Sequence, residues 1–166
     1  MMTSICAWCK NELTQEEGET SVLPFFGMCG NCREMFFPRT GAPKFRRALD
    51  RLDVPVLAMD DDTKIVIAND AACHLFGKER EEIERKRSGD LFACTNTWLP
   101  GGCGKAPGCT NCGLREVVKD TYTTGKGHES VHATVTCGSP GRSHKLELLL
   151  STMKAGELVV VKMVPI

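Results

Sequence analysis

Three Cys-x-x-Cys pairs restrict what this chain can fold into more than any other feature of its sequence. The pairs are Cys6 with Cys9, Cys29 with Cys32, and Cys109 with Cys112. The chain has 166 residues and 10 cysteines in total. In a reducing compartment, so many thiols are poor candidates for structural disulfides, and metal ligation or redox chemistry is the better expectation.

The first two pairs have the spacing of a four-cysteine zinc site. CAWC (6–9) and CGNC (29–32) each bring two thiolates to one ion from a single turn. The segment between them is too polar and too short to form its own core, so bound zinc would supply much of the stability of residues 1–40. We therefore expect a structural zinc here, with two unrelated redox-active thiol turns as the alternative. The expected ligands are Cys6, Cys9, Cys29 and Cys32.

The pattern ICAWCK…GMCGNC resembles the small zinc-ribbon modules found at the ends of bacterial signalling proteins. Many zinc ribbons bind nucleic acid, but the loop between these pairs is acidic. It carries Glu12, Glu16, Glu17 and Glu19. Lys plus Arg and Asp plus Glu are each 21, so the formal charge is zero. Nucleic acid is therefore not expected to be the main partner.

A Pro/Gly break at 38–43 separates this module from the rest of the chain. We expect a linker helix at 41–53, because Phe45, Leu49 and Leu52 share one apolar stripe. This helix packs onto the body or pairs with a second copy. No apolar stretch is as long as a membrane span, and the start of the chain lacks a secretory pattern, so a cytoplasmic protein is expected.

Residues 54–166 predict an α+β domain with a five-stranded antiparallel sheet and helices on one face. PVLAM and KIVIA form a hairpin around the turn DDDT, and alternation at 131–137 begins three more strands. Helices are expected at 69–77, where Asn69 or Asp70 is the cap, at 78–89, and at 113–125. The sequence order of two strands, several helices and three strands suits this arrangement.

The segment PVLAMDDDTKIVIANDAACHLFG and the three closing strands resemble the PAS family over residues 54–166. The resemblance implies that helices and sheet enclose a small ligand or cofactor. It also implies that signals leave through the terminal helix or the sheet surface.

The second cysteine group lies where a PAS domain has its short connecting helices. It comprises Cys94, Cys103, Cys109 and Cys112. Neighbouring glycines allow the backbone to wrap closely, and the last pair precedes a helix whose N-terminus favours thiolates. We expect zinc or an iron–sulfur cluster, with free or disulfide-forming thiols as the alternative. The stretch GDLFACTN…GGCG…CTNCG resembles a cysteine-rich variant of PAS domains in bacterial sensory proteins.

The remaining cysteines, Cys73 and Cys137, are expected to be small buried apolar residues, and Trp98 to fix the loop by packing.

These patterns favour a sensory or regulatory module that responds to redox state or a small ligand. Its partner would be a signalling protein, such as a kinase or regulator, or a second copy in a homodimer. A thiol oxidoreductase and a zinc-ribbon nucleic-acid adaptor are the alternatives. No catalytic triad, phosphate loop or carboxylate pair is evident, so we do not expect an enzyme.

Overall fold

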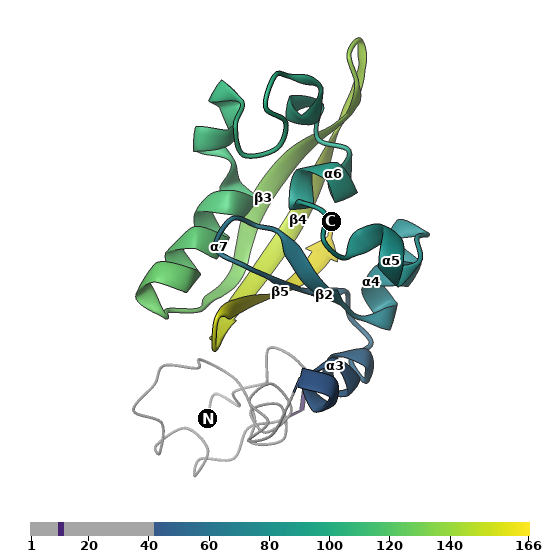
Figure 1. Ribbon diagram of the computed structural model, residues 1–166, viewed down its shortest axis with the longest axis vertical. Helices are drawn as coiled ribbons and strands as arrows, with labels where there is room; N and C mark the ends of the chain where they lie inside the picture. Colours follow the sequence, from purple (N-terminus) through teal and green to yellow (C-terminus); the bar gives the residue numbers. More distant parts are fainter. Residues whose placement is uncertain (1–9, 12–41) are drawn as a thin grey trace.

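A five-stranded antiparallel sheet forms one layer of the computed structural model (Figure 1). The structure describes residues 10–11 and 42–166. The strand order is β2-β1-β5-β4-β3. The strands are β1 (Val56–Met59), β2 (Ile65–Ala68), β3 (His128–Ser139), β4 (Arg142–Ala155) and β5 (Leu158–Pro165). The expected α+β architecture and the two groups of strands are thus confirmed, whereas the expected zinc module at 1–40 lies outside the described residues apart from Lys10 and Asn11.

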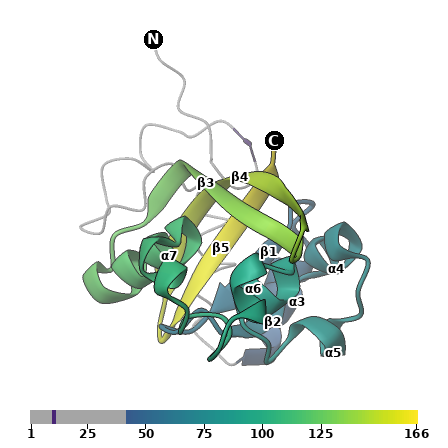
Figure 2. The same cartoon turned by 90° about the horizontal axis from the view of Figure 1, so that it is seen from above.

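Helix α3 (Ala42–Asp50) precedes β1, and the other helices connect β2 to β3. These are α4 (Asp70–Phe76), α5 (Arg80–Ile83), α6 (Ser88–Phe92) and α7 (Gly113–Thr124), with the short 3-10 helices η1 (Thr95–Trp98) and η2 (Pro107–Asn111). Seen from above, α6 and α7 lie on the same side of the sheet (Figure 2). None of the described helices is both long and apolar enough to cross a membrane.

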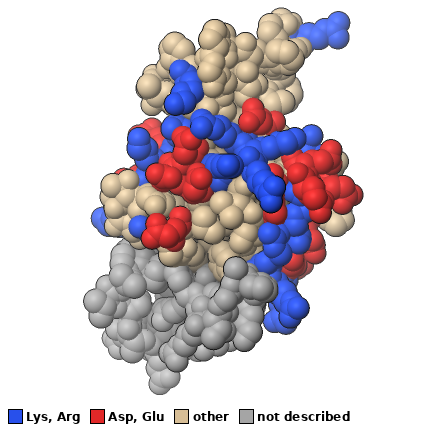
Figure 3. Space-filling view, viewed as in Figure 1, with Lys and Arg blue, Asp and Glu red and all other residues tan. Residues whose placement is uncertain are grey.

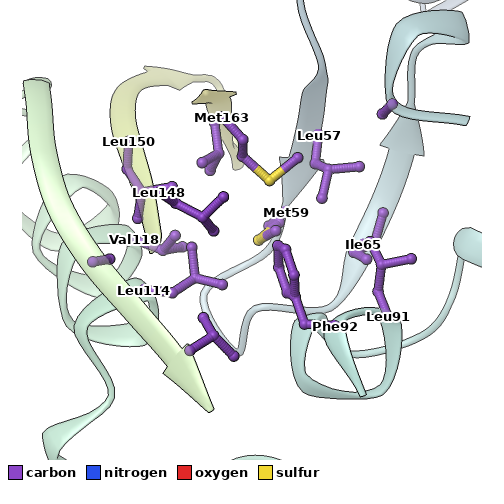
Figure 4. Packing of buried hydrophobic residues seen from close by; sticks show 14 of the residues in the cluster. Leu57, Met59, Ile65, Leu91, Phe92, Leu114, Val118, Leu148, Leu150 and Met163 are labelled. Atoms are coloured by element: carbon purple, nitrogen blue, oxygen red, sulfur yellow. The ribbon is translucent and has the colours of Figure 1, made fainter. Parts of the chain in front are cut away.

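Apolar side chains fill the space between the sheet and the helices. Met59 and Met163 from the sheet, Phe92 from α6 and Leu114 from α7 point toward one another (Figure 4). Phe92 also meets Phe76 of α4 edge to face, with 5.2 Å between ring centroids. The inward residues of β3 are Ala133, Val135 and Cys137, as their alternation predicts. Cys137 is only 3% exposed, which confirms its expected burial.

Asn69 joins three segments through its side-chain amide and is fully buried. Its Oδ1 accepts hydrogen bonds from the backbone N–H groups of Val56 and Ala72, both at 2.9 Å. Its Nδ2 donates to the carbonyls of Leu49 and Val54, also at 2.9 Å. Asn69 is therefore the N-cap of α4, and the same side chain ties the end of α3 to the start of β1.

The helix expected at 78–89 is much shorter in the structure. α5 ends at Ile83, and the chain then runs beside β2. Arg85 N–H donates to the Ile65 carbonyl at 2.7 Å, and Ile65 N–H donates to the Lys86 carbonyl at 2.8 Å. Bonds to the open edge of β2 thus replace the hydrogen bonds that would have continued the helix.

The C-terminal end of α7 is held to β4 and to the turn that follows it. Lys154 Nζ lies 2.8 Å from the Tyr122 carbonyl and 4.7 Å from the centre of its ring. The Tyr122 hydroxyl donates to Glu157 at 3.0 Å. At the preceding residue, the buried hydroxyls of Thr121 and Thr152 are 2.6 Å apart. These contacts fix the last turn of the helix on the sheet.

Candidate functional site

The cysteine-rich loop, residues 93–112, connects α6 to α7 and contains η1 and η2. It lies at the upper end of the molecule in Figure 1. Lys105 is its single charged residue. The upper part of the space-filling view is accordingly mostly uncharged, whereas acidic and basic side chains crowd the band below it (Figure 3). Helix α6 ends because Ala93 takes a left-handed conformation with φ 53°, and the chain turns into the loop there.

The four predicted ligands of the second site all lie in or at the end of this loop. Cys94 directly precedes η1, Cys103 lies in the turn between η1 and η2, and Cys109 lies within η2. Cys112 is the N-cap residue of α7. Cys109 is buried at 6% exposure, and the other thiols are half-buried. The chain thus brings these four thiols to one end of the molecule.

Backbone groups act on three of the four sulfur atoms. Gly104 N–H donates a hydrogen bond to Cys109 Sγ at 3.2 Å. The backbones of Asn96 and Gly89 lower the pKa of Cys94 and Cys103, respectively. A donor aimed at sulfur stabilises a thiolate more than a thiol, because the bond to a charged acceptor is stronger. The loop therefore offers its sulfur atoms partners that suit the deprotonated form.

In the free thiols, burial disfavours the deprotonated thiolate form. Desolvation is the largest influence on the pKa of Cys94 and raises it, the Asn96 N–H lowers it, and the charges of Cys112 and Cys109 raise it further. The pKa of Cys103 is raised in the same way, by burial first. Both groups are therefore protonated at neutral pH unless a cation replaces the proton.

Gly89 in α6 leaves the space that Cys103 occupies. A Cβ added at Gly89 would lie 2.6 Å from Cys103 Sγ and 2.8 Å from Cys103 Cβ. Real Cβ atoms do not come so close, so any larger residue at Gly89 would displace the loop. This helix position was not identified from the sequence, because a glycine inside a five-residue helix carries no sign of what packs against it.

The four-cysteine donor set suits zinc or an iron–sulfur cluster. Among residues 10–11 and 42–166, however, no group of three or more His, Cys, Asp or Glu side chains is arranged to hold a metal ion. Ligation at this site therefore stays a prediction, and it would require the loop side chains to move together. The other predicted set, Cys6, Cys9, Cys29 and Cys32, lies outside the described residues.

Two arginines fix the loop to the β1–β2 turn through one carboxylate, a feature that sequence reasoning missed. Asp62 forms an ion pair with Arg87 at 2.6 Å and accepts a hydrogen bond from Arg115 at 2.8 Å. Arg87 also donates to the Cys103 carbonyl at 2.7 Å. A Cβ at Gly104 would lie 2.7 Å from Arg115 Nη1 and 2.9 Å from Arg87 Nη1, so both guanidinium groups rest against the loop backbone. Arg115 Nη1 is buried and has no hydrogen-bond partner among the described residues.

The same carboxylate has a perturbed pKa. Burial alone would raise the pKa of Asp62, but the hydrogen bond from Arg115 and the charges of Arg87 and Arg115 lower it below its ordinary value. Asp62 is therefore ionised throughout the neutral range. Its side chain is 43% exposed, so solvent screens part of this attraction.

A groove of about 550 Å³ runs from the loop along the outer face of α7. Its lining residues are Gly104, Cys109, Thr110, Arg115, Glu116, Lys119, Asp120, Thr123 and Thr124. The lining contains both acidic and basic groups as well as hydroxyls. The groove lies beside the cysteine-rich loop and not between the sheet and the helices, where the ligand was expected.

Trp98 and Cys94 attach the loop to the outer edge of β3. The indole N–H of Trp98 donates to the Gly138 carbonyl at 3.1 Å, although its side chain is 63% exposed. Gly138 N–H donates to the Ala93 carbonyl at 2.8 Å, and Cys94 stands opposite Cys137 in an antiparallel bridge. Trp98 thus fixes the loop by a hydrogen bond more than by burial of its ring.

Comparisons with known proteins agree with this architecture. A family model described as the PAS fold matches residues 44–95. Among solved structures, the LOV protein of Rhodobacter sphaeroides aligns with a TM-score of 0.50 at 15% identity, covering 75% of this chain and 65% of that one. The chain therefore spans about two thirds of the length of that protein. No sequence among the curated proteins compared matches this chain.

Two further solved structures align somewhat less closely. The PAS domain of nitrogen regulation protein NR(II) from Vibrio parahaemolyticus has a TM-score of 0.47 at 19% identity, with 76% of this chain and 100% of that chain covered. The PAS domain of the Cronobacter turicensis RpfR quorum-sensing receptor, in complex with BDSF, has a TM-score of 0.48 at 13% identity, with 70% and 96% covered. At these identities the likeness concerns the fold alone.

Proposed function

We propose that this PAS domain, which spans residues 54–166, is the sensory part of a signal-transduction protein. Its input site in this proposal is the cysteine-rich loop, where Cys94, Cys103, Cys109 and Cys112 bind zinc or an iron–sulfur cluster. The state of that metal site is the signal. The domain has a sensing role in this proposal and not a catalytic one.

The observation that carries the proposal is the set of backbone groups that act on sulfur. Gly104 N–H donates to Cys109 at 3.2 Å, and the backbones of Asn96 and Gly89 lower the pKa of Cys94 and Cys103. Such bonds are of little use to a neutral thiol, which is a weak acceptor, but they stabilise a ligating thiolate and tune a bound cluster. Burial raises the pKa of Cys94 and Cys103, so a bound cation is what would bring these sulfur atoms into the charged form.

When bound, zinc would cross-link the loop, and an iron–sulfur cluster would add one-electron redox chemistry. Cys109 and Cys112 would hold it at the start of α7, and Cys94 and Cys103 would hold it from the α6 side. The Asp62 carboxylate, through Arg87 and Arg115, would keep the loop backbone in place around the ligands.

The signal is proposed to pass to a protein partner, a kinase or regulator, or to a second copy of the chain. The N-terminal cysteines, Cys6, Cys9, Cys29 and Cys32, are proposed to bind a separate structural zinc. That module would dock the sensor to its partner, since its acidic loop disfavours nucleic acid.

The groove along α7 supports a second candidate, the binding of a small polar molecule. It lies directly beside Cys109 and Arg115, and its volume of about 550 Å³ is within the range of small-molecule sites. In this second candidate function, the cysteine-rich loop forms part of the groove wall, and binding of the small molecule is the signal. Binding that survives removal of all metal would favour this candidate over the first.

Metal analysis of the full chain, purified without oxygen, tests the proposal. We expect bound zinc, or iron with sulfide and visible absorption, in addition to the N-terminal zinc. Cys112→Ser should remove the metal of the loop and leave that of the N-terminal module. Cys73→Ser, which changes a half-buried cysteine of α4, is the matched control and should remove neither. A folded, reduced chain in which Cys112→Ser changes no metal content would contradict the proposal.

A further inference from the structure

Cys94 and Cys137 stand directly opposite each other at the outer edge of β3. The adjacent pair is hydrogen-bonded, because Gly138 N–H donates to the Ala93 carbonyl at 2.8 Å. In an antiparallel ladder the next pair along is then of the non-hydrogen-bonded type. Residues in such a pair have Cα atoms about 4.5 Å apart, and their side chains are closer together than in the other type.

This placement meets the geometric requirements of a disulfide. Disulfide-bonded cysteines have Cα atoms about 4.4 to 6.8 Å apart. Directly opposed residues also point to the same face of a sheet, and here that face is the one that the helices cover. Cys137 belongs to the core, Cys94 packs against it, and both thiols are free. A bond between them would join two residues that the fold already places opposite each other.

Their burial differs in the way that a two-step oxidation requires. Cys137 is 3% exposed and its Sγ faces the Val135 carbonyl at 3.6 Å, so an oxidant in solution does not reach it first. Cys94 is half-buried at the start of η1. Cys94 is therefore the thiol that meets the oxidant, and Cys137 is its resolving partner.

We propose that Cys94 and Cys137 form a reversible disulfide when the protein meets a peroxide. The Cys94 sulfur loses its proton and attacks one peroxide oxygen, the O–O bond breaks, and Cys94 becomes a sulfenic acid, while the departing hydroxide combines with the released proton to form water. Cys137 sulfur then attacks Cys94 sulfur. The S–S bond forms, the S–O bond breaks, and the hydroxyl leaves with the Cys137 proton as a second water. Two thiols lose two electrons, and the peroxide gains them.

This inference does not depend on whether the loop binds a metal. Where it does, the disulfide takes Cys94 away from the four cysteines of the proposed site and leaves three, so oxidation would release or rearrange the metal. A dithiol reverses the reaction, because it returns both electrons and restores two thiols. The pair is thus a modification site that links peroxide to the same loop.

The test uses the full chain, reduced and then freed of metal with a chelator, so that failure of the metal proposal does not affect it. The chain is treated with hydrogen peroxide, remaining thiols are blocked, and the peptides are mapped by mass spectrometry. Trypsin places Cys137 in peptide 127–142, and cleavage after Trp98 separates Cys94 from Cys103. We expect the majority of Cys137 to be joined to Cys94, and dithiothreitol to reverse the link.

Controls separate this pair from chance oxidation among the chain's 10 cysteines. Cys103→Ser should leave the link intact, whereas Cys94→Ser should abolish it and leave Cys137 open to alkylation after unfolding. In concentrated guanidinium chloride, which unfolds the chain, the same treatment should link Cys137 through disulfides to many different cysteines. A Cys137 that stays a free thiol in the oxidised native protein, or that joins mainly to Cys103, Cys109 or Cys112, would overturn the proposal.

Discussion

At the scale of single residues, the domain depends on side chains that serve several segments at once. Asn69 uses both groups of its amide, and each makes two bonds to buried or half-buried backbone. Gly89 acts by having no side chain, since Cys103 fills the space where a Cβ would be. Such residues contribute more than their size suggests, because their replacement leaves backbone groups unpaired or pushes a loop out of place.

Replacement of Asn69 by Ala should lower the free energy of unfolding by about 3 kcal/mol or more, because each buried backbone group left unpaired costs about 1 to 3 kcal/mol. Urea denaturation followed by circular dichroism measures the change. Asp70→Asn, which alters the next residue on the exposed side of the same helix start, should change it by less than about 1 kcal/mol. Equal losses in the two variants would contradict the role assigned to Asn69.

Replacement of Gly89 by Ala should destabilise the protein by about 1 to 3 kcal/mol, as overpacking usually does. Because the loop must shift, Cys103 should also react faster with a thiol reagent. Gly113→Ala at the start of α7 is the matched control, since its added Cβ would meet Ala133 Cβ at an ordinary 3.6 Å. A Gly89→Ala protein with unchanged Cys103 reactivity would show that the loop does not rest on α6 as described.

At the scale of elements, the loop is held from three sides. The β1–β2 turn holds it through Asp62, the edge of β3 holds it through Gly138, and α7 continues directly from its last cysteine. The first contact is electrostatic and the second is made by hydrogen bonds. The loop should therefore respond to acid differently at its two attachments.

The contribution of Asp62 should disappear in acid. Its pKa is lower in the folded protein than in the unfolded chain, so its contribution is complete above the unfolded pKa of about 3.9. It is lost as the pH falls through the folded pKa. At neutral pH, Asp62→Asn should therefore be less stable than the native protein by under about 1 kcal/mol, given the exposure of this side chain. Denaturation curves at several pH values, with and without added salt, should show the two proteins converge below about pH 4.

The open edge of β2 explains how far the secondary structure could be predicted from the sequence. Alternation along 131–137 and the turn DDDT correctly predicted the strands, since both signals are local. The helix expected at 78–89 was wrong as one continuous helix, because residues 85–86 bond to Ile65 of the neighbouring strand between the end of α5 at Ile83 and the start of α6 at Ser88. Hydrogen bonds to a neighbouring strand determine where this helix ends, and a local sequence pattern does not reveal such bonds.

For the candidate site, too, local features could be predicted from the sequence, whereas long-range contacts could not. Spacing and glycines indicated that Cys94, Cys103, Cys109 and Cys112 belong to one region, and the fold brings them to one end. The contact of Asp62 with Arg115, which lies 53 positions along the chain, could not be read from the sequence. The pairing of Cys94 with Cys137 also depends on where the loop meets the edge of the sheet. Both contacts join residues that are distant in the sequence, so they could be identified only from the structure.

At the scale of the whole molecule, stability is concentrated in the sheet and its helix-covered face. β5 lies between β1 and β4, and most of its residues are buried. The cysteine-rich loop, by contrast, consists of short turns and two 3-10 helices with many half-buried or exposed residues. A protein built in this way opens locally at the loop well before it unfolds as a whole.

Hydrogen exchange should display this difference directly. Amides of β4 and β5 should exchange slowest, and those of residues 95–111 much faster in the metal-free, reduced chain. If the loop binds metal, exchange of the Gly104 amide should slow markedly on loading, since this N–H donates to the Cys109 sulfur. Loop amides that exchange as slowly as those of β5 without metal would contradict this distribution of stability.

The contacts at the far end of α7 determine how a change in the loop would travel. Lys154 and Glu157 clamp Tyr122 near the last turn, while the first turn of the helix begins at Cys112. A rearrangement of the sulfur atoms would therefore be expected to displace the first turn of α7 more than its last turn, which Tyr122 fixes next to the β4–β5 turn.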